Sequence, residues 1–234
     1  RQAEFLLYDH IPEVLIGGAT GGGKSDALLM AALLYADVPG YAALILRRTY
    51  ADLALPGALM DRAQTWLHGT GARWNGLEKK WTFPSGATLS FGYLETETDK
   101  FRYKSSEFQY IAFDELTTFL ETQYTYLFSR LRRLQAAPVP VRMRAGTNPG
   151  DVGHEWVKKR FIPDEALKGS VDDFFSRSWR KSSRIFVPAR MEDNPALDRV
   201  AYDEALANLD PVTRKQYRHG DCKGHADGRF HHLW

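Results

Sequence analysis

Hydrophobic residues along this chain form two kinds of segment: short runs with strand character and longer segments with helical spacing. The strand-like runs occupy residues 14–17, 41–46, 109–113, 141–145 and 184–187. The helix-like segments occupy residues 1–7, 26–34, 53–67, 121–134 and 154–161. Short apolar runs are typical of strands that a parallel sheet buries on both faces. Because the two kinds alternate, we predict an α/β protein with a mainly parallel central sheet flanked by helices.

Three segments depart from this alternation. Residues 81–83 and 87–93 flank the turn sequence Pro84-Ser85-Gly86, which predicts a β-hairpin at the edge of the sheet. Pro56-Gly57 predicts a break near the start of the helical segment 53–67. Residues 95–104 are charged, and Lys100 to Arg102 within them are predicted to lie in a mobile loop.

The C-terminal part has a different pattern. Residues 195–209 and 211–218 predict two helices, each with a proline at its first position. Residues 220–234 are rich in glycine and histidine and show no core pattern. We therefore expect an α/β core over residues 1–190 and a C-terminal helical subdomain with the start of a linker over 191–234.

The most specific signal is the loop from Gly18 to Ser25, which reads GATGGGKS. It follows the first strand-like run and leads into the helical segment 26–34. This strand, loop and helix form the context in which the pattern G-x-x-x-x-G-K-[ST] is a phosphate-binding loop. The alternative is a glycine-rich turn with a lysine by chance, and the flanking elements argue against it.

The residue types in this loop suit a nucleoside triphosphate. Backbone N–H groups can approach phosphate closely where side chains are absent, and the following helix N-terminus favours negative charge. Lys24 is expected to reach the β- and γ-phosphates, and the Ser25 hydroxyl is expected to bind Mg²⁺. The remaining candidate contacts for ATP in this loop are Gly18, Thr20, Gly21, Gly22 and Gly23.

A second candidate motif is Asp114-Glu115, which directly follows an apolar strand. Asp114 is expected to hold the metal, as an acidic residue does at this strand end in P-loop NTPases. Glu115 has the reach to orient the water that attacks the γ-phosphate and to accept its proton. The alternative is an acidic pair that caps the next helix.

A third candidate motif, Gly146-Thr147-Asn148-Pro149, follows another strand. The Thr147 hydroxyl and the Asn148 amide could hydrogen-bond the γ-phosphate or its attacking water and transmit its loss to the rest of the domain. An ordinary Asn-Pro turn is the alternative.

Phosphoryl transfer usually also needs an arginine, from the same chain or from a neighbour. The loop from Gly18 to Lys24 contains none. Arg102, in the charged stretch before Asp114, is the first candidate, followed by Lys104 and Arg130. A solvated surface arginine is the alternative.

Composition narrows the class of protein. The 234 residues are 44% hydrophobic and 26% charged, which is ordinary for a globular protein. No apolar run is long enough for a membrane span, and we find no signal-peptide features, so we expect a cytosolic protein. The single cysteine, Cys222, excludes an internal disulfide. A net charge of +2 is too small to indicate nucleic-acid binding by itself.

With these motifs in order, the chain resembles the ATPase domain of the large terminase subunit, the DNA-packaging motor of tailed double-stranded-DNA bacteriophages. The resemblance covers nearly the whole chain. The further segments that carry it are Gln2, Arg47-Arg48-Thr49, Lys100-Phe101-Arg102-Tyr103, Asp193-Asn194-Pro195-Ala196-Leu197, Gly220-Asp221 and Gly228-Arg229-Phe230.

The resemblance implies a P-loop ATPase of the additional-strand class that forms a ring, commonly a pentamer, at the portal protein of a capsid. It implies double-stranded DNA and a small terminase subunit as further partners, and the cytoplasm of an infected bacterium as the location. It also implies roles for single residues: Gln2 at the adenine, Thr147 and Asn148 as the coupling motif, and Arg102 as an arginine finger in trans.

Two features depart from the family. Many relatives carry an arginine in the phosphate loop, so its sensing role is unassigned here. The chain also ends near where the family's nuclease domain would begin, so we expect a motor domain without nuclease activity. A helicase-like or recombinase-like ATPase remains an alternative. So does a nucleotide-gated assembly module with little turnover as a monomer.

Overall fold

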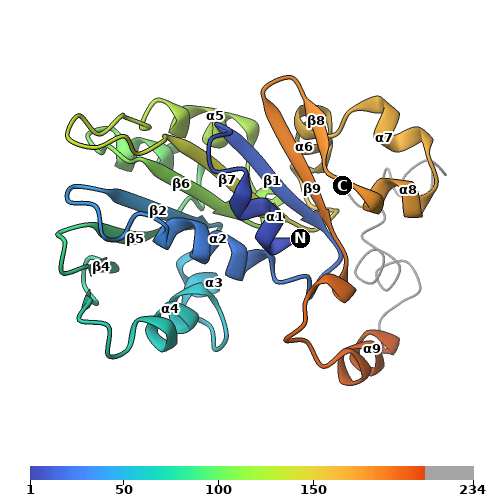
Figure 1. Cartoon of the computed structure of the whole chain (residues 1–234), viewed down its shortest axis with the longest axis horizontal. Helices are drawn as coiled ribbons and strands as arrows, with labels where there is room; N and C mark the ends of the chain where they lie inside the picture. The colour runs from blue at the N-terminus through green and yellow to red at the C-terminus, as the bar shows by residue number, and fades with distance from the viewer. Residues whose placement is uncertain (209–234) are drawn as a thin grey trace.

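A computed structural model describes residues 1–208 of the protein. Over this range the strands form one nine-stranded sheet with the order β3-β4-β5-β2-β6-β7-β1-β9-β8 (Figure 1). The strands are β1 (Glu13–Gly18), β2 (Ala42–Arg47), β3 (Arg73–Asn75), β4 (Lys80–Thr82), β5 (Thr88–Tyr93), β6 (Tyr110–Asp114), β7 (Arg142–Thr147), β8 (Trp179–Lys181) and β9 (Arg184–Ala189).

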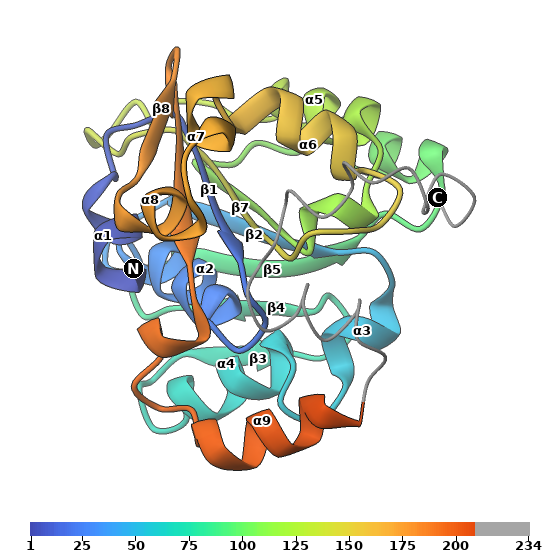
Figure 2. The same ribbon diagram turned by 90° about the vertical axis from the view of Figure 1, so that its right-hand side faces the viewer.

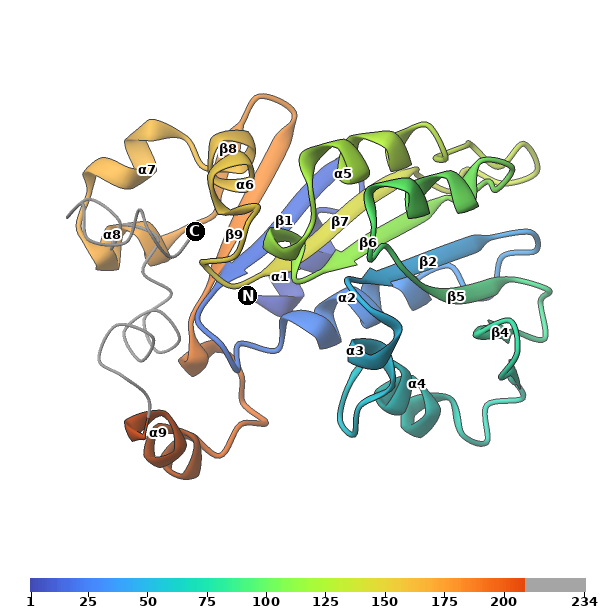
Figure 3. The ribbon, with the colours of Figure 1, turned by 180° about the vertical axis from the view of Figure 1, so that it is seen from behind.

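The six strands from β5 to β9 in this order are parallel to their neighbours, which confirms the predicted α/β class. The two edges are antiparallel. The β4–β5 pair is the predicted hairpin, with β3 added outside it, and β8 pairs with β9 at the other edge (Figure 3). β7 lies between β1 and β6, so a strand separates the phosphate loop from Asp114-Glu115, as expected for the additional-strand class.

Helices cover both faces of the sheet. In Figure 2, α5 and α6 lie above the sheet, and α2 and α4 lie below it. The helices are α1 (Gln2–Leu7), α2 (Lys24–Leu33), α3 (Tyr50–Ala54), α4 (Leu59–Leu67), α5 (Glu121–Phe128), α6 (His154–Phe161), α7 (Asp164–Lys168), α8 (Val171–Ser176) and α9 (Arg199–Ala207), with short 3-10 helices η1 (Glu97–Tyr103), η2 (Leu116–Thr118) and η3 (Met191–Asp193). None of the helices in the described part of the chain has the length and apolarity to cross a membrane.

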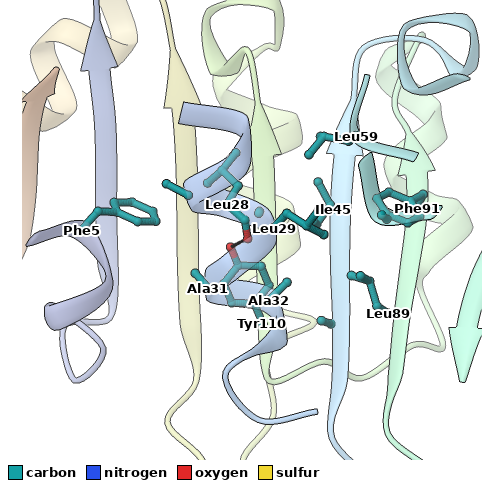
Figure 4. Packing of buried hydrophobic residues seen from close by; sticks show 14 of the residues in the cluster. Phe5, Leu28, Leu29, Ala31, Ala32, Ile45, Leu59, Leu89, Phe91 and Tyr110 are labelled. Carbon is teal, nitrogen blue, oxygen red and sulfur yellow. Dashed lines mark hydrogen bonds between the residues drawn. The ribbon is translucent and has the colours of Figure 1, made fainter. Parts of the chain in front are cut away.

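Each face of the sheet has its own hydrophobic core. Below the sheet, α2 packs its small and branched residues against β2 and β6; Figure 4 shows Leu28 and Leu29 of α2 beside Ile45 and Tyr110. The buried Tyr110 hydroxyl donates to the Leu28 carbonyl at 2.7 Å, so the one polar atom in this contact is satisfied. The other core is more aromatic and lies under α5 and α6. The two cores together hold the central strands, and hence the strand ends, in fixed positions.

Several element predictions are corrected. The helix predicted over 121–134 ends at Phe128, because the next residues pair with another segment: the Phe108 N–H donates to Arg130 and the Arg132 N–H to Phe108. The predicted mobile loop forms η1, which begins with a capping box between Thr96 and Asp99.

Short elements were the least predictable. The helix predicted from Pro195 begins at Arg199, and β3, β8, α7 and α8 were not predicted. The break at Pro56-Gly57 is confirmed, since α3 ends before it and α4 begins after it. The predicted helix 211–218 and Cys222 lie outside the described residues. The proposed division into a core over 1–190 and a C-terminal subdomain stays a prediction.

Candidate active site

Three predicted motifs meet at the carboxyl ends of the parallel strands. The register pairs Gly17 of β1 with Thr147 of β7, and Gly146 of β7 with Asp114 of β6. The phosphate loop, the Thr147-Asn148 segment and Asp114-Glu115 are therefore neighbours, although they lie far apart in the sequence. Open α/β sheets bind their ligands at the carboxyl ends of their strands.

The phosphate loop adopts a backbone that requires glycine. Gly18, Gly21 and Gly23 have φ values of 136°, 76° and 70°, in a region that side chains other than glycine rarely adopt. A Cβ at Gly18 would lie 2.3 Å from the Ala189 carbonyl oxygen. The loop is thus compact, and Gly21 to Gly23 place no side chains of their own over its backbone N–H groups immediately before α2 begins at Lys24.

Lys24 points back into this loop. Its ammonium is buried and donates to the Ala19 carbonyl at 2.6 Å. Burial lowers the pKa of Lys24, and the nearby carboxylates of Glu115 and Asp114 oppose that shift. The Lys24 side chain therefore ends inside the loop, where a phosphate would bind.

Ser25 and Asp114 are in direct contact. The Ser25 hydroxyl donates to the carboxylate of Asp114, 3.0 Å from Oδ1 and 3.2 Å from Oδ2. A hydroxyl and one carboxylate fit Mg²⁺, which usually keeps waters and phosphate oxygens as its other ligands. No cluster of three or more His, Cys, Asp or Glu side chains within residues 1–208 could hold a metal alone.

Asp114 has a second partner that sequence reasoning did not assign to the site. Arg47, the last residue of β2, donates through Nε to Asp114 Oδ2 at 2.7 Å. Two signals pointed to it: Arg47 is a polar residue at the carboxyl end of a strand, and it belongs to the Arg47-Arg48-Thr49 segment of the family resemblance.

Glu115 has a strained backbone and a restrained side chain. Its φ and ψ are 57° and 59°, a left-handed conformation that is uncommon for residues other than glycine. The Asn148 amide donates to both carboxylate oxygens, at 3.0 and 3.1 Å. Glu115 as a whole is partly exposed. Burial around its carboxylate and the charge of Asp114 nevertheless raise the pKa of Glu115, against the opposing effect of Lys24.

The two side chains of the Thr147-Asn148 motif contact different residues. Asn148 faces Glu115, whereas the buried Thr147 hydroxyl lies 2.9 Å from that of Thr117. Thr117 belongs to η2, directly after Glu115, and its carbonyl accepts the Gly153 N–H at 2.7 Å. The motif thus connects the Glu115 segment to the start of α6. Its predicted role as a coupling motif stays a prediction.

Two amides lie against the phosphate loop from opposite ends of the chain. Gln2 Nε2 donates to the Gly22 carbonyl at 2.9 Å, which places its side chain against the phosphate loop. Its role at the adenine stays a prediction. Asn194 Nδ2 donates to the Gly21 carbonyl at 2.7 Å. Asn194 was not among the predicted site residues, although it belongs to the Asp193-Asn194-Pro195 segment that resembles the family. Thr20 Oγ1 is buried without a hydrogen-bond partner among the described residues.

Arg102 lies apart from this assembly. It is on η1, where it pairs with Asp99 at 2.9 Å and stacks on the Tyr93 ring at 4.4 Å from the centroid. Its side chain is 46% exposed. The two other candidates lie in the same region: Arg130 donates to the Lys104 carbonyl, and Lys104 is exposed. Within residues 1–208, none of these three cations has a hydrogen bond or ion pair to the phosphate loop or to the Asp114-Glu115 pair.

Comparisons with known proteins place the fold. The large terminase of a thermophilic bacteriophage matches with a TM-score of 0.66 and 15% identity, over 94% of this chain and 52% of that chain. The N-terminal domain of the DNA packaging ATPase from bacteriophage phi29 matches with a TM-score of 0.56 and 14% identity, over 85% and 97%. The large terminase ATPase domain of Thermus phage P74-26 matches with a TM-score of 0.56 and 12% identity, over 93% of this chain and 92% of that chain.

This chain spans about half the length of the first of these proteins. A comparison with curated protein sequences finds no match. The family model for the N-terminal part of the terminase large subunit, T4-like-virus type, matches residues 15–220. That range includes the phosphate loop, Asp114-Glu115 and Thr147-Asn148. The chain therefore belongs to the family of N-terminal domains of terminase large subunits of the T4-like-virus type.

Proposed function

We propose that this domain hydrolyses ATP with Mg²⁺ and uses the reaction to move double-stranded DNA into a viral procapsid. The observation that carries the proposal is the contact of Ser25 with Asp114, with Glu115 at the next position. This contact brings the phosphate loop next to the Asp114-Glu115 pair, where we propose that Ser25 and Asp114 bind Mg²⁺ and that Glu115 acts as the base. The comparisons support the proposal, since one relative is named a DNA packaging ATPase.

Relatives also support the choice of nucleotide. The large terminase of the thermophilic bacteriophage forms complexes with ADP and with ATP-gamma-S, at 16% and 14% identity to this chain. We propose that Gly18, Thr20 and Gly21 to Gly23 contact ATP phosphates, and that Gln2 contacts the adenine. Mg²⁺ at Ser25 and Asp114 would withdraw charge from the phosphates and orient them for in-line attack.

The protein's own residues would then carry out three tasks. Lys24 would exchange the Ala19 carbonyl for phosphate oxygens. Glu115 would accept a proton from the attacking water, for which a raised pKa is suited. Asn148, which holds that carboxylate in the structure, would set its direction. A hydrogen bond from Asn148 to the phosphate or water would then compete with its bond to Glu115.

The partners follow from the family. We propose that the domain works in a homo-oligomeric ring, of five subunits in the commonest arrangement, together with a portal protein and a small terminase subunit. Its location would be the cytoplasm of the infected bacterium and, during packaging, the procapsid portal. Arg102 would complete the site of a neighbouring subunit.

The test of hydrolysis is Glu115→Gln. The amide keeps the size of the side chain and can still accept from Asn148, but it cannot take a proton. We expect ATP turnover to fall about 10²-fold or more, measured as phosphate release by the oligomeric protein on its portal with DNA. Binding of ATP-gamma-S should be retained, and Glu107→Gln, an exposed carboxylate, serves as the matched control. Normal turnover by Glu115→Gln would contradict the proposal.

The second candidate function is a nucleotide-gated assembly module with little turnover alone. The exposed position of Arg102, away from the loop of its own subunit, favours it. The two candidates differ in how turnover per subunit depends on protein concentration.

A further inference from the structure

Arg47 and Ser25 contact the same carboxylate oxygen of Asp114, since Arg47 Nε lies 2.7 Å and Ser25 Oγ 3.2 Å from Oδ2. β2 and β7 flank β6, and Ser25 reaches Asp114 from the loop side while Arg47 reaches it from β2. The Asp114 side chain is 2% exposed and that of Arg47 25% exposed. The buried Asp114 carboxylate therefore accepts hydrogen bonds from both the predicted metal-binding hydroxyl of Ser25 and the guanidinium of Arg47.

Charge explains why a cation is held here. Asp114 and Glu115 place two carboxylates side by side, and the loop from Gly18 to Gly23 supplies no arginine to balance them. Arg47 Nε lies 2.7 Å from Asp114 Oδ2, which places a guanidinium against this pair. Arg47 is thus the cation that faces the acidic pair from the β2 side.

Among the described residues, most hydrogen-bonding capacity of Arg47 is unused. A guanidinium has five N–H donors, and Arg47 uses the one on Nε for Asp114. Neither of its terminal nitrogens donates to a residue within 1–208. The neighbouring Arg48 differs, because its Nη1 donates to the Leu94 carbonyl at 3.0 Å and to Gln123 at 3.3 Å. A planar pair of donors that no residue in 1–208 uses, beside a carboxylate proposed to bind Mg²⁺, suits a phosphate.

We infer that Arg47 contacts the γ-phosphate of ATP within its own subunit and shares its guanidinium between that phosphate and Asp114. The inference rests on the proposed ATPase function and deepens it. Arg47 then supplies from β2 a positive charge that the phosphate loop lacks. Because ADP has no γ-phosphate, Arg47 would distinguish ATP from ADP without a residue from a neighbouring subunit.

The test compares two dissociation constants, for ATP-gamma-S and for ADP, each with Mg²⁺, by titration calorimetry of the purified full chain. For Arg47→Met we expect affinity for ATP-gamma-S to fall about 10-fold or more, as for loss of a charge-assisted hydrogen bond, and affinity for ADP to change by less than about 3-fold. An Arg47 that only orients Asp114 would weaken both nucleotides equally, and that result, or no change for either, would overturn the inference.

Arg48→Met is the matched control, because it removes an arginine from the same strand end without touching Asp114. Its two affinities should change by equal factors. Failure of the proposed function looks different: the unaltered protein itself would bind neither nucleotide.

A second measurement does not depend on the stability of Arg47→Met. In the ¹⁵N spectrum of the unaltered protein, the Nε–H signal of Arg47 can be assigned by its absence from Arg47→Lys. We expect this signal to move on addition of ATP-gamma-S with Mg²⁺ and to move less with ADP. Identical shifts for the two nucleotides would overturn the inference.

Discussion

Glu115 combines three unfavourable features in one residue. Its backbone is left-handed, its carboxylate is desolvated, and a second carboxylate is adjacent in sequence. Such costs are usually found where function requires them. The two hydrogen bonds from the Asn148 amide offset part of the cost and fix the side chain at the strand edge.

The raised pKa of Glu115 has a consequence for stability. The folded protein binds the Glu115 proton more tightly than the unfolded chain does, so this residue stabilises the fold below its ordinary pKa of 4.5. That contribution is lost as the pH rises through the raised value. At pH 7.5, in EDTA without nucleotide, Glu115→Gln should therefore melt about 2–4 °C higher than the unaltered protein, which corresponds to about 1 kcal/mol.

The pH profile of this difference is the decisive measurement. Calorimetry from pH 7.5 to about pH 4 should show the advantage of Glu115→Gln shrinking toward zero as Glu115 becomes protonated in the unaltered protein. Glu107→Gln should show no such profile. A difference that is constant over this range would show that charge on Glu115 is not its cause.

At the scale of elements, β7 carries two arginines that hold the N-terminal segment to the sheet. Arg142 pairs with Asp9 and donates to the Tyr41 hydroxyl at 3.1 Å. Arg144, which is fully buried, donates to the carbonyls of Tyr8 and Ile11 at 2.8 and 2.9 Å. Burial lowers the pKa of Arg144 to about 10. These contacts fix α1, and with it Gln2, relative to the phosphate loop.

Arg144→Met tests this connection. Methionine fills much of the same space but leaves buried carbonyls without donors, at a cost of about 1–3 kcal/mol each. We expect the free energy of unfolding in urea to fall by about 3 kcal/mol, and the affinity for ATP-gamma-S to fall with it because Gln2 loses its position. Arg73→Met, at an exposed position of β3, should change stability by less than about 0.5 kcal/mol. If Arg144→Met is destabilised but keeps its affinity for ATP-gamma-S, the position of α1 does not affect nucleotide binding.

At the scale of the whole molecule, the candidate cations are distributed over two regions. Lys24 and Arg47 lie at the candidate site of their own chain, while Arg102 lies on η1 beside Tyr93. Within residues 1–208 the one ion pair of Arg102 is with Asp99, and its side chain is exposed, so it is accessible to a second copy of the protein. We therefore expect the full catalytic constellation to form only between subunits.

This expectation can be measured as ATPase rate per subunit against protein concentration. The rate should rise steeply where subunits associate, and Arg102→Ala should lose turnover at all concentrations while keeping its affinity for ATP-gamma-S. Arg62→Ala, which removes another partly exposed arginine, is the control. A fast rate that is independent of concentration would exclude a finger in trans, and turnover retained by Arg102→Ala would assign the finger to another residue.

Local pattern predicted most of the central elements. The strands over β1, β2, β6, β7 and β9 were located within a few residues, because each is an apolar or alternating run bounded by polar residues. The helix 154–161 was predicted with its observed ends. The short elements α7, α8 and β8 were missed, since five or six residues or fewer carry little periodic signal. The end of α5 was misplaced because pairing of Phe108 with residues 130–132 overrides helical spacing.

The sequence by itself determined the phosphate loop, the acidic pair after β6 and the α/β class, because each depends on residues close together in the chain. The tertiary structure alone decided which side chains meet. Arg47 reaches Asp114 because β2 pairs with β6, and Asn148 reaches Glu115 because β7 lies on the other side of β6. Strand order is set by long-range pairing, which local hydrophobic pattern does not encode.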